Sequence, residues 1–293
     1  MVRFERARRR GDMAGQHEWD ALFANASTSA MSLYDEILVP RWFEPWARLL
    51  LDILKPENGQ AVLDVACGPG TVTRLVAQLV GLEGSVTGCD LSPAMLELAR
   101  SKISVNGSAP ITYLECPADA LAFPDDAFDL VTCQQGLQFF PNRNAALAEV
   151  RRVLRPGGKL GIAVWCAIEE CPPCLALANA LEQALGTEVA DAYKGGPWGL
   201  SDATSLVDLA NDSGFTNVEV RKYELPVVFD GGPGQLSQSL RVTSVAATLA
   251  QLSEASQIAL ATAVEDAARQ ITENGIVRSH TASHILTAEA NGK

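Results

Sequence analysis

Residues 62–73 read VLDVACGPGTVT, and the fold of the chain can be derived outward from this stretch. Its first residues are apolar and predict a buried strand, Gly68 and Gly70 predict a tight turn, and the β-branched residues from Thr71 open a helix. Glycine has no Cβ, so a ligand can lie directly on the backbone of such a turn. The N-terminus of the following helix favours negative charge. We therefore predict a ligand-binding turn at the carboxyl edge of a sheet.

Strands and helices alternate around this turn. We predict strands at 61–66, 85–90, 111–118, 128–134 and 159–166, and helices at 71–81, 92–104 and 145–154, with a turn at 155–158. Ser92 is suited to the N-cap of the second helix, with Pro93 at its first position. Apolar strands of this kind are typical of a parallel sheet that is covered by helices on both faces. The pattern predicts an α/β, Rossmann-like fold.

The segments on either side of this core differ from it. Residues 18–55 predict a cap of aromatic-rich helices broken by prolines, and 56–166 form the cofactor-binding core. Beyond residue 166 we predict a substrate-side half, 167–290, with a helical lid insertion at about 231–275. All of 18–290 would form a single domain. Residues 1–17, with five arginines in the first ten positions, predict a disordered basic tail.

The overall charge and the cysteines limit the class of function. A formal net charge of −12 argues against nucleic acid as a partner, because phosphates require a basic face. No apolar run approaches the roughly 18 residues of a membrane span. The seven cysteines are an odd number, which suits buried thiols in a reducing compartment better than disulfides. We expect a cytoplasmic protein that acts on a small molecule, and a homodimer stays open.

Cys171-Pro172-Pro173-Cys174 is the single C-x-x-C pattern of the chain. A zinc site needs about four ligands, and the only histidines are His17, His280 and His284. His280 and His284 would share one face of a strand, but no acidic partner stands near them. We therefore predict no metal, and interpret Cys171 and the two prolines as the start of a helix.

Three ligand classes fit a glycine turn of this kind, and Asp64 separates them. A triphosphate loop needs a lysine, which is absent after Gly70. The dinucleotide fingerprint GxGxxG is only weakly matched, because Thr73 stands at its third glycine. Asp64 with Ala66, Gly68 and Gly70 resembles motif I, (D/E)-x-G-x-G-x-G, of the class I S-adenosylmethionine-dependent methyltransferases. Ala66 replaces the first glycine of that motif and adds one methyl group.

The resemblance to this family covers residues 30–166 closely and continues loosely to the end of the chain. It points to the small-molecule branch, similar to ubiquinone/menaquinone-biosynthesis enzymes with a methyltransferase type 11 domain. It implies S-adenosylmethionine as the cofactor. It also implies a seven-stranded, mostly parallel sheet of order 3-2-1-4-5-7-6, with the last strand antiparallel.

The resemblance assigns roles to residues around the cofactor. A carboxylate at Asp90, which ends the second strand, can accept two hydrogen bonds from a ribose diol. Leu91 and Met95 would pack on the adenine, and Asp119 would accept a hydrogen bond from its amine. Tyr34 would close over the methionine end. The complete implied set is Tyr34, Asp64, Ala66, Gly68, Gly70, Asp90, Leu91, Met95, Ala118, Asp119, Ala120 and Gln134.

The catalytic residues are less clearly marked. Many relatives carry a histidine after the fourth strand, whereas residues 134–140 read QQGLQFF. Gln138 stands at the position of that histidine, and an amide can orient a substrate atom but cannot take its proton. Either the acceptor supplies an anion or a free amine, or another group acts, with His17 as the candidate base. Gln138 and His17 are therefore the predicted catalytic residues.

The sequence thus predicts a methyltransferase that transfers a methyl group, by in-line displacement, to an O, N or C nucleophile of a small, planar or apolar metabolite. The aromatic helices before residue 55 and the C-terminal insertion are candidates for a lid that excludes water. Two alternatives stay open: a protein of this fold that binds the cofactor without methyl transfer, and an NAD-dependent oxidoreductase.

Overall fold

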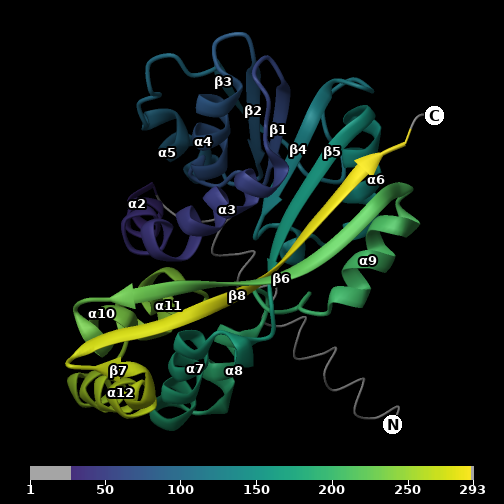
Figure 1. The fold of residues 1–293 in the computed structure, drawn as a ribbon. Helices are drawn as coiled ribbons and strands as arrows, with labels where there is room; N and C mark the ends of the chain where they lie inside the picture. Colours follow the sequence, from purple (N-terminus) through teal and green to yellow (C-terminus); the bar gives the residue numbers. More distant parts are fainter. Residues whose placement is uncertain (1–27, 292–293) are drawn as a thin grey trace.

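The computed structural model describes residues 28–291, which form a mixed sheet with helices on both faces and a group of helices at one end (Figure 1). Five parallel strands come first: β1 Ala61–Val65, β2 Ser85–Asp90, β3 Ile111–Glu115, β4 Phe128–Gln134 and β5 Leu154–Trp165. β8 (Ile276–Ala290) then pairs antiparallel with β5 and with β6 (Phe215–Phe229).

The strand order is β3-β2-β1-β4-β5-β8-β6, and the two-residue β7 (Thr272–Glu273) pairs with β8 beside this path. The Rossmann-like fold and the expected order with an antiparallel last strand are confirmed. The segment 155–158 differs from its prediction as a turn before the strand. It lies within β5 as an irregularity, because Phe128 pairs with Leu154 whereas Leu130 already pairs with Lys159.

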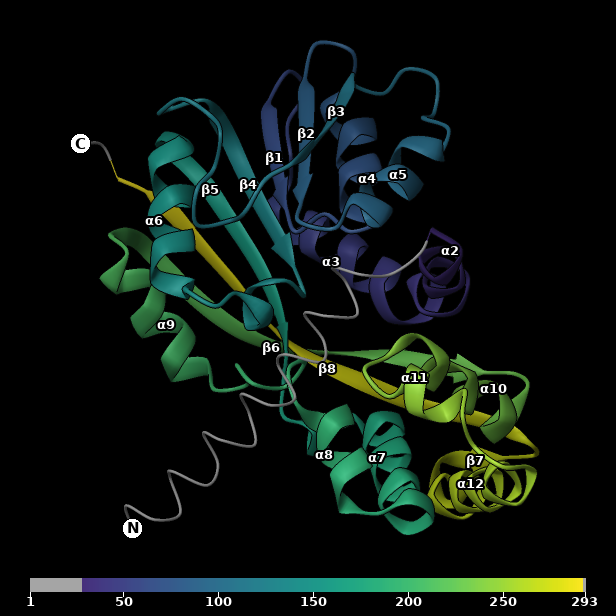
Figure 2. The ribbon, with the colours of Figure 1, turned by 180° about the vertical axis from the view of Figure 1, so that it is seen from behind.

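Successive residues of β1 point to opposite faces of the sheet, and both faces are buried. Val62 lies in the core beneath α3 (Glu44–Leu54), α4 (Thr71–Val80) and α5 (Pro93–Ser101). Leu63 lies in the core beneath α6 (Arg143–Val153) and α9 (Ala203–Asp212) (Figures 1 and 2). Ser92 caps α5 as predicted, because its hydroxyl accepts the Met95 N–H. Because β1, β2 and β4 are parallel, the loops that follow them lie at one edge of the sheet.

The N-terminal cap consists of α2 (Thr28–Ile37), the π-helix η1 (Val39–Phe43) and α3. Prolines stand in the first turns of η1 and α3, where a missing N–H breaks no helical hydrogen bond. Trp46 is fully buried, and its Nε1 donates to Thr281 Oγ1 of β8 at 2.9 Å. This bond ties the cap to the long strand. The part of the predicted cap before residue 28, and the predicted tail, lie outside the described residues.

β6 and β8 run beyond the sheet into a second group of helices, which we call the helical lobe (Figure 1). The lobe contains α7 Pro172–Leu185, α8 Thr187–Lys194, α10 Gly232–Gln238, η4 Ser239–Val242, α11 Ala246–Leu249, α12 Glu254–Ala267 and η5 Arg269–Ile271. Two further short 3-10 turns, η2 Leu137–Phe139 and η3 Ile168–Glu170, follow β4 and β5. The predicted insertion at about 231–275 contains α10, η4, α11, α12 and η5. Cys171 is the N-cap of α7, so the predicted helix start is confirmed.

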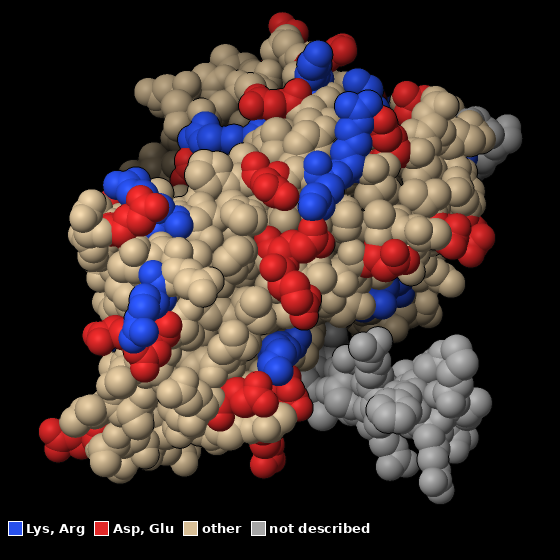
Figure 3. Space-filling view, turned by 60° about the horizontal axis from the view of Figure 1, so that its bottom comes forward, with Lys and Arg blue, Asp and Glu red and all other residues tan. Residues whose placement is uncertain are grey.

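Charged side chains on the described surface often lie beside groups of opposite sign. On the face shown in Figure 3, Lys and Arg groups lie against Asp and Glu groups. Lys222 pairs with Glu170, and Arg152 pairs with Glu149 and Asp125. Within residues 28–291, no helix has both the length and the hydropathy that crossing a membrane requires.

Candidate active site

A cavity of about 520 Å³ lies at the carboxyl ends of β1, β2 and β4, between the sheet, the N-terminal cap and the helical lobe. On the sheet side it is lined by the glycine turn, the start of α5 and the loops after β3 and β4. On the other side it is lined by η1 and by residues of α7, α8 and η4. This is the edge at which parallel α/β sheets bind ligands. The glycine turn therefore lies where its sequence pattern predicts.

The two glycines of the turn are required for different reasons. Gly68 lines the cavity with a φ of +52°, and among the described residues no atom beyond its two chain neighbours lies within 4 Å of the position that a Cβ would take. Gly70 has a φ of +74°, and a Cβ there would collide with the Tyr113 hydroxyl. Gly70 is not among the described residues that line the cavity. Gly70 is thus required for packing against Tyr113, and its predicted contact with the cofactor stays a prediction.

Ala66, which replaces the first glycine of the motif, lines the cavity with a φ of +55°. A left-handed conformation costs a residue with a side chain roughly 1–2 kcal/mol, so the turn is strained at this point. The Cβ of Ala66 faces Gly136, in the loop after β4. The methyl group is thus accommodated against a second glycine.

Asp90 ends β2 and holds the glycine turn. Its Oδ2 accepts the Gly68 N–H at 2.8 Å, and its Oδ1 accepts the Ser92 N–H at 2.9 Å. Burial raises the pKa of Asp90, while the backbone hydrogen bonds oppose this rise. The Leu91 backbone N–H acts on this carboxylate as well. A carboxylate has about four lone-pair sites, so it can still accept a hydrogen bond from a ligand. Since Asp90 lines the cavity, its carboxylate is placed to accept from the expected ribose diol.

Asp64 connects three elements beneath the cavity. Thr73 Oγ1 of α4 donates to its Oδ2 at 2.6 Å, and Thr132 Oγ1 of β4 donates to its Oδ1 at 2.9 Å. Burial raises the pKa of Asp64 to about 6, although the two hydroxyl groups act in the opposite direction. Thr73 stands where a dinucleotide motif would have its third glycine. Here its hydroxyl donates the hydrogen bond that Asp64 Oδ2 accepts.

The residues expected around the adenine differ in whether they line the cavity. Leu91, Met95, Ala118 and Asp119 line the cavity, and Leu91 is 61% exposed while Met95 is buried. Ala120 is not among the described lining residues, and its N–H donates to the Pro117 carbonyl at 3.3 Å. This hydrogen bond stabilises the loop after β3, and the assignment of Ala120 to the cofactor site stays a prediction.

Tyr34 and Gln134 line the cavity and connect it to the N-terminal cap. Tyr34 stacks on Phe43, with ring centroids 5.4 Å apart. Burial, and then the nearby Asp90 carboxylate, raise the pKa of Tyr34, so its hydroxyl stays protonated. Gln134 Nε2 donates to the Phe43 carbonyl at 2.8 Å. These contacts hold the cap over the carboxyl end of β4.

The loop after β4 places its glutamines differently from the prediction. Gln138 is buried, its Nε2 donates to the Gln135 carbonyl at 3.0 Å, and it is not among the described lining residues. Gln135 lines the cavity instead, with a φ of +53° and its Nε2 donating to Ser283 Oγ at 3.0 Å. Gln135 thus lines the cavity where Gln138 was expected to orient a substrate atom, and the role of Gln138 stays a prediction. His17, the predicted base, lies outside the described residues.

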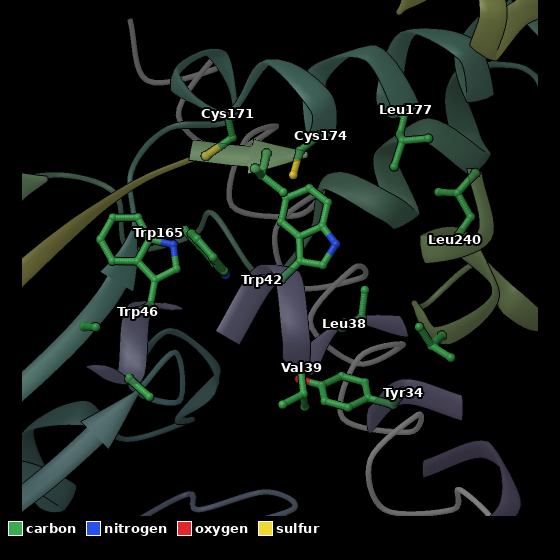
Figure 4. Packing of buried hydrophobic residues seen from close by; sticks show 14 of the residues in the cluster. Tyr34, Leu38, Val39, Trp42, Trp46, Trp165, Cys171, Cys174, Leu177 and Leu240 are labelled. Atoms are coloured by element: carbon green, nitrogen blue, oxygen red, sulfur yellow. The ribbon is translucent and has the colours of Figure 1, made fainter. Parts of the chain in front are cut away.

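The side of the cavity toward the cap and the helical lobe is built from residues of which only Cys174, in the C-x-x-C pattern, belongs to a sequence motif. They are aromatic or weakly polar and come from separate segments: Trp165, Cys174, Tyr193, Trp198, Ser239 and Thr243. Trp42 and Phe43 of η1 complete this wall. Figure 4 shows Trp42 between the cap and α7, with Trp165 and Cys174 nearby. The aromatic composition of residues 42–46 was the only local signal of this wall.

Potential metal and redox groups do not form a cluster in the described part of the chain. Within residues 28–291, no group of three or more His, Cys, Asp and Glu side chains is placed to hold a metal. His284 Nε2 lies 3.0 Å from the Ser201 carbonyl. All seven cysteines are free and buried. Burial raises the pKa of Cys174, so its thiol is protonated where it lines the cavity.

The fold and this site define a protein of the class I methyltransferase type, with a Rossmann-like sheet and a ligand cavity at its carboxyl edge. The sequence model of the ubiE/COQ5 methyltransferase family matches residues 20–229. The chain belongs to this family, and the resemblance seen in its motifs is confirmed. A ubiquinone/menaquinone biosynthesis C-methyltransferase UbiE from Shewanella pealeana is 39% identical over 116 residues, 39% of this chain and 46% of that protein. The chain thus spans about half the length of the curated relatives that it matches.

Solved structures share the fold. Phosphoethanolamine N-methyltransferase 2 of Haemonchus contortus, in complex with S-adenosyl-L-methionine, aligns with a TM-score of 0.57 and 19% identity over 94% of this chain and 60% of that chain. The YcgJ protein of Bacillus subtilis aligns with a TM-score of 0.56 and 16% identity over 84% and 98%. At this identity the likeness concerns the fold alone. The family match does not favour the NAD-dependent oxidoreductase alternative.

Proposed function

We propose that the protein is an S-adenosylmethionine-dependent methyltransferase that acts on a small, planar or apolar acceptor. One observation carries this proposal: Gly68 and Asp90, joined by a hydrogen bond of 2.8 Å, both line the cavity, and the Asp90 carboxylate is placed to accept from a ribose diol. Membership in the ubiE/COQ5 methyltransferase family supports the same function.

The residues along the cavity fit the parts of the cofactor in order. The backbone at Gly68 would lie against the adenosyl group, and Asp90 would accept the ribose hydroxyls. Leu91 and Met95 would contact the adenine, while the exposed Asp119 would accept a hydrogen bond from its amine. When bound, S-adenosylmethionine supplies a methyl group on a sulfonium that is already activated for displacement.

The contribution of the protein is then alignment and exclusion of water. Holding two reactants in line is worth about 7–11 kcal/mol of the barrier in well-oriented systems. The aromatic wall provides an apolar surface for a flat acceptor, and Ser239 and Thr243 of the insertion lie on that wall. We infer that the N-terminal cap and the insertion 231–275 act as a lid over the reaction.

The acceptor carries its own nucleophile in this proposal. Burial raises the pKa of Tyr193 and of Cys174, so neither side chain is a base near neutral pH. The names of the curated relatives support a quinone-type ring and a carbon atom as the site of methylation. The seven free cysteines support a reducing compartment such as the cytoplasm.

Calorimetric titration tests the proposal. The protein, stripped of bound ligand, is titrated with S-adenosylmethionine, S-adenosylhomocysteine and NADH. We expect micromolar binding of both adenosyl compounds and none of NADH. Binding of NADH alone would contradict the proposed methyl transfer and would favour the oxidoreductase alternative.

A further inference from the structure

A second pocket lies where the N-terminal cap meets the insertion. It has a volume of about 360 Å³, and eight described residues of α2, η1, β6, α10 and η4 line it. None of these eight is among the described residues that line the cavity at the carboxyl edge of the sheet. α2 lies against η4, and η1 lies against β6, so the pocket is part of the junction between cap and insertion. It is therefore a candidate site separate from the cofactor cavity.

Two arginines line this pocket, one from each part of the junction. Arg41 belongs to η1 of the cap, and Arg241 belongs to η4 of the insertion. Within residues 28–291 neither guanidinium group has a hydrogen bond or an ion pair. The other arginines that the structure describes, Arg278 apart, each donate to a carbonyl or carboxylate group. Two available guanidinium groups at one small pocket indicate an anionic ligand.

Arg41 is held in place by an aromatic ring. Its guanidinium carbon lies over the ring of Phe229, 5.9 Å from the centroid, and Phe229 is only 1% exposed. Phe229 also packs against Trp42, with ring centroids 5.6 Å apart. The donors of a guanidinium group lie in its plane, so contact with a ring face leaves them available. η1, which carries Arg41, is a π-helix, and such turns are frequent at functional sites.

The polar residues beside the two arginines favour a phosphate group. Gln235 and Gln238 of α10 line the pocket three positions apart, hence on one face of the helix. Gln235 Oε1 accepts the Gly231 N–H at 3.1 Å, which leaves its amide N–H groups as donors. Glu36 is the one acidic residue of the described lining, so two arginines and one glutamate give a formal charge of +1. Phosphate has three acceptor oxygens and a carboxylate has two, so phosphate matches this set of donors better.

We propose that Arg41 and Arg241 form a phosphate-binding site, separate from the cofactor cavity, which takes the phosphate group of a soluble phosphorylated molecule or of a lipid head group. The two guanidinium groups donate to the phosphate oxygens from the cap and from the insertion, and the amides of Gln235 and Gln238 donate from α10. The bound group thereby joins the cap to the insertion. The site does not depend on the methyl acceptor or on the proposed methyl transfer.

Calorimetric titration of the full chain in magnesium-free buffer tests the site. The probes are inorganic pyrophosphate and malonate, which carry two phosphoryl and two carboxylate groups, and each is titrated with and without saturating S-adenosylhomocysteine. The variants are Arg41→Gln, Arg241→Gln and Glu36→Gln. Arg278→Gln is the matched control, because Arg278 is an exposed arginine of β8 that is not among the described lining residues of either pocket.

We expect wild-type protein and Arg278→Gln to bind pyrophosphate more tightly than malonate, with no displacement by S-adenosylhomocysteine. Arg41→Gln and Arg241→Gln should each lower the affinity for pyrophosphate at least about tenfold. Glu36→Gln should raise it at least about threefold, because a like charge is removed. Arg241 is exposed, so Arg241→Gln keeps the test valid if Arg41→Gln does not fold.

Sedimentation with vesicles of phosphatidylcholine, with and without phosphatidylglycerol, separates the two sources of the phosphate group. Pyrophosphate binding without vesicle binding assigns the site to a soluble phosphorylated molecule, and vesicle binding that is lost in Arg241→Gln assigns it to a lipid head group.

The proposal is overturned if neither pyrophosphate nor vesicles bind, or if malonate binds as tightly as pyrophosphate. It is also overturned if S-adenosylhomocysteine displaces the probe, or if Arg278→Gln loses as much affinity as Arg241→Gln. Failure of S-adenosylhomocysteine to bind is read separately and counts against the proposed function.

Discussion

Ala66 and Gly136 share one small space between the glycine turn and the loop after β4. A Cβ added at Gly136 would lie only 2.6 Å from the Cβ of Ala66, closer than such atoms approach in proteins. Gly136 itself has a φ of −107°, which any residue adopts. The glycine at position 136 is therefore required by contact with the Ala66 methyl group, and the departure of this chain from motif I is matched by a second glycine across the site.

A double-mutant cycle tests this relationship. Gly136→Ala should destabilise the protein by about 1–3 kcal/mol through overpacking. Ala66→Gly should be close to neutral, since relief of the left-handed strain is offset by a more flexible unfolded chain. The double variant should recover at least about 1 kcal/mol, measured by urea unfolding. Purely additive effects would show that the two positions do not compete for space.

Gly68→Ala should separate ligand binding from stability. Beyond the two chain neighbours of Gly68, the added methyl group meets no atom of the residues that the structure describes, so only the strain of a φ of +52° lowers stability, by about 1–2 kcal/mol. The methyl group enters the cavity, so affinity for S-adenosylhomocysteine should fall at least about tenfold. Gly107→Ala is the matched control, because Gly107 has a φ of +87°, free space around its Cβ position and no place in the cavity lining. Equal cofactor affinity in both variants would contradict the role of Gly68.

Asp90→Ala should weaken the binding of S-adenosylhomocysteine by about 2–4 kcal/mol, because it removes a charge-assisted pair of hydrogen bonds. It also releases the Gly68 N–H, so the turn should lose some stability as well. Calorimetry measures the affinity, and Asp208→Ala, at an exposed position of α9, provides the control. Wild-type affinity in Asp90→Ala would exclude the ribose assignment.

Asp64 should make stability fall as pH rises from about 4 to about 6. Its folded pKa of about 6 lies above the ordinary value of 3.8, so the folded state holds the proton more tightly than the unfolded chain. The stabilisation is complete below pH 4 and is lost as the pH rises through the folded pKa. At about 1.4 kcal/mol per pKa unit the loss amounts to about 3 kcal/mol. Asp64→Asn should not show this contribution, so its stability relative to wild type should rise over this range, and parallel pH profiles of urea unfolding would contradict the prediction.

The cofactor side of the site was largely predictable from the sequence. Tyr34, Asp64, Ala66, Gly68, Asp90, Leu91, Met95, Ala118, Asp119 and Gln134 were predicted at the cofactor and line the cavity. Most of them follow a strand of a parallel sheet within a few residues, and the ends of such strands meet at one edge by topology alone. Gly70 and Ala120 were also predicted there but are not among the described lining residues, because local pattern cannot show whether a backbone faces a ligand or a neighbouring side chain.

The backbone conformation of the loop after β4 explains why Gln135, and not Gln138, lines the cavity. Gln135 adopts a left-handed conformation, which turns the loop so that this side chain faces the cavity and Gln138 is buried behind it. Single-residue changes of direction in a loop depend on contacts such as that of Gln135 Nε2 with Ser283 Oγ, which joins positions 148 apart in the chain.

The sequence by itself determined the strand–turn–helix at 61–80 and the acidic end of β2, since short-range sterics and hydrogen bonding act locally. The order of the sheet was implied by the resemblance of the motifs to the methyltransferase family. Only the tertiary structure decided the acceptor wall. Trp42, Trp165, Tyr193, Trp198 and Ser239 are distributed over nearly 200 positions and meet because β6 and β8 extend past the sheet and carry the helical lobe toward the cap. No local sequence pattern predicts that these residues come together, because their proximity results from burying apolar surface between segments that are remote in the chain.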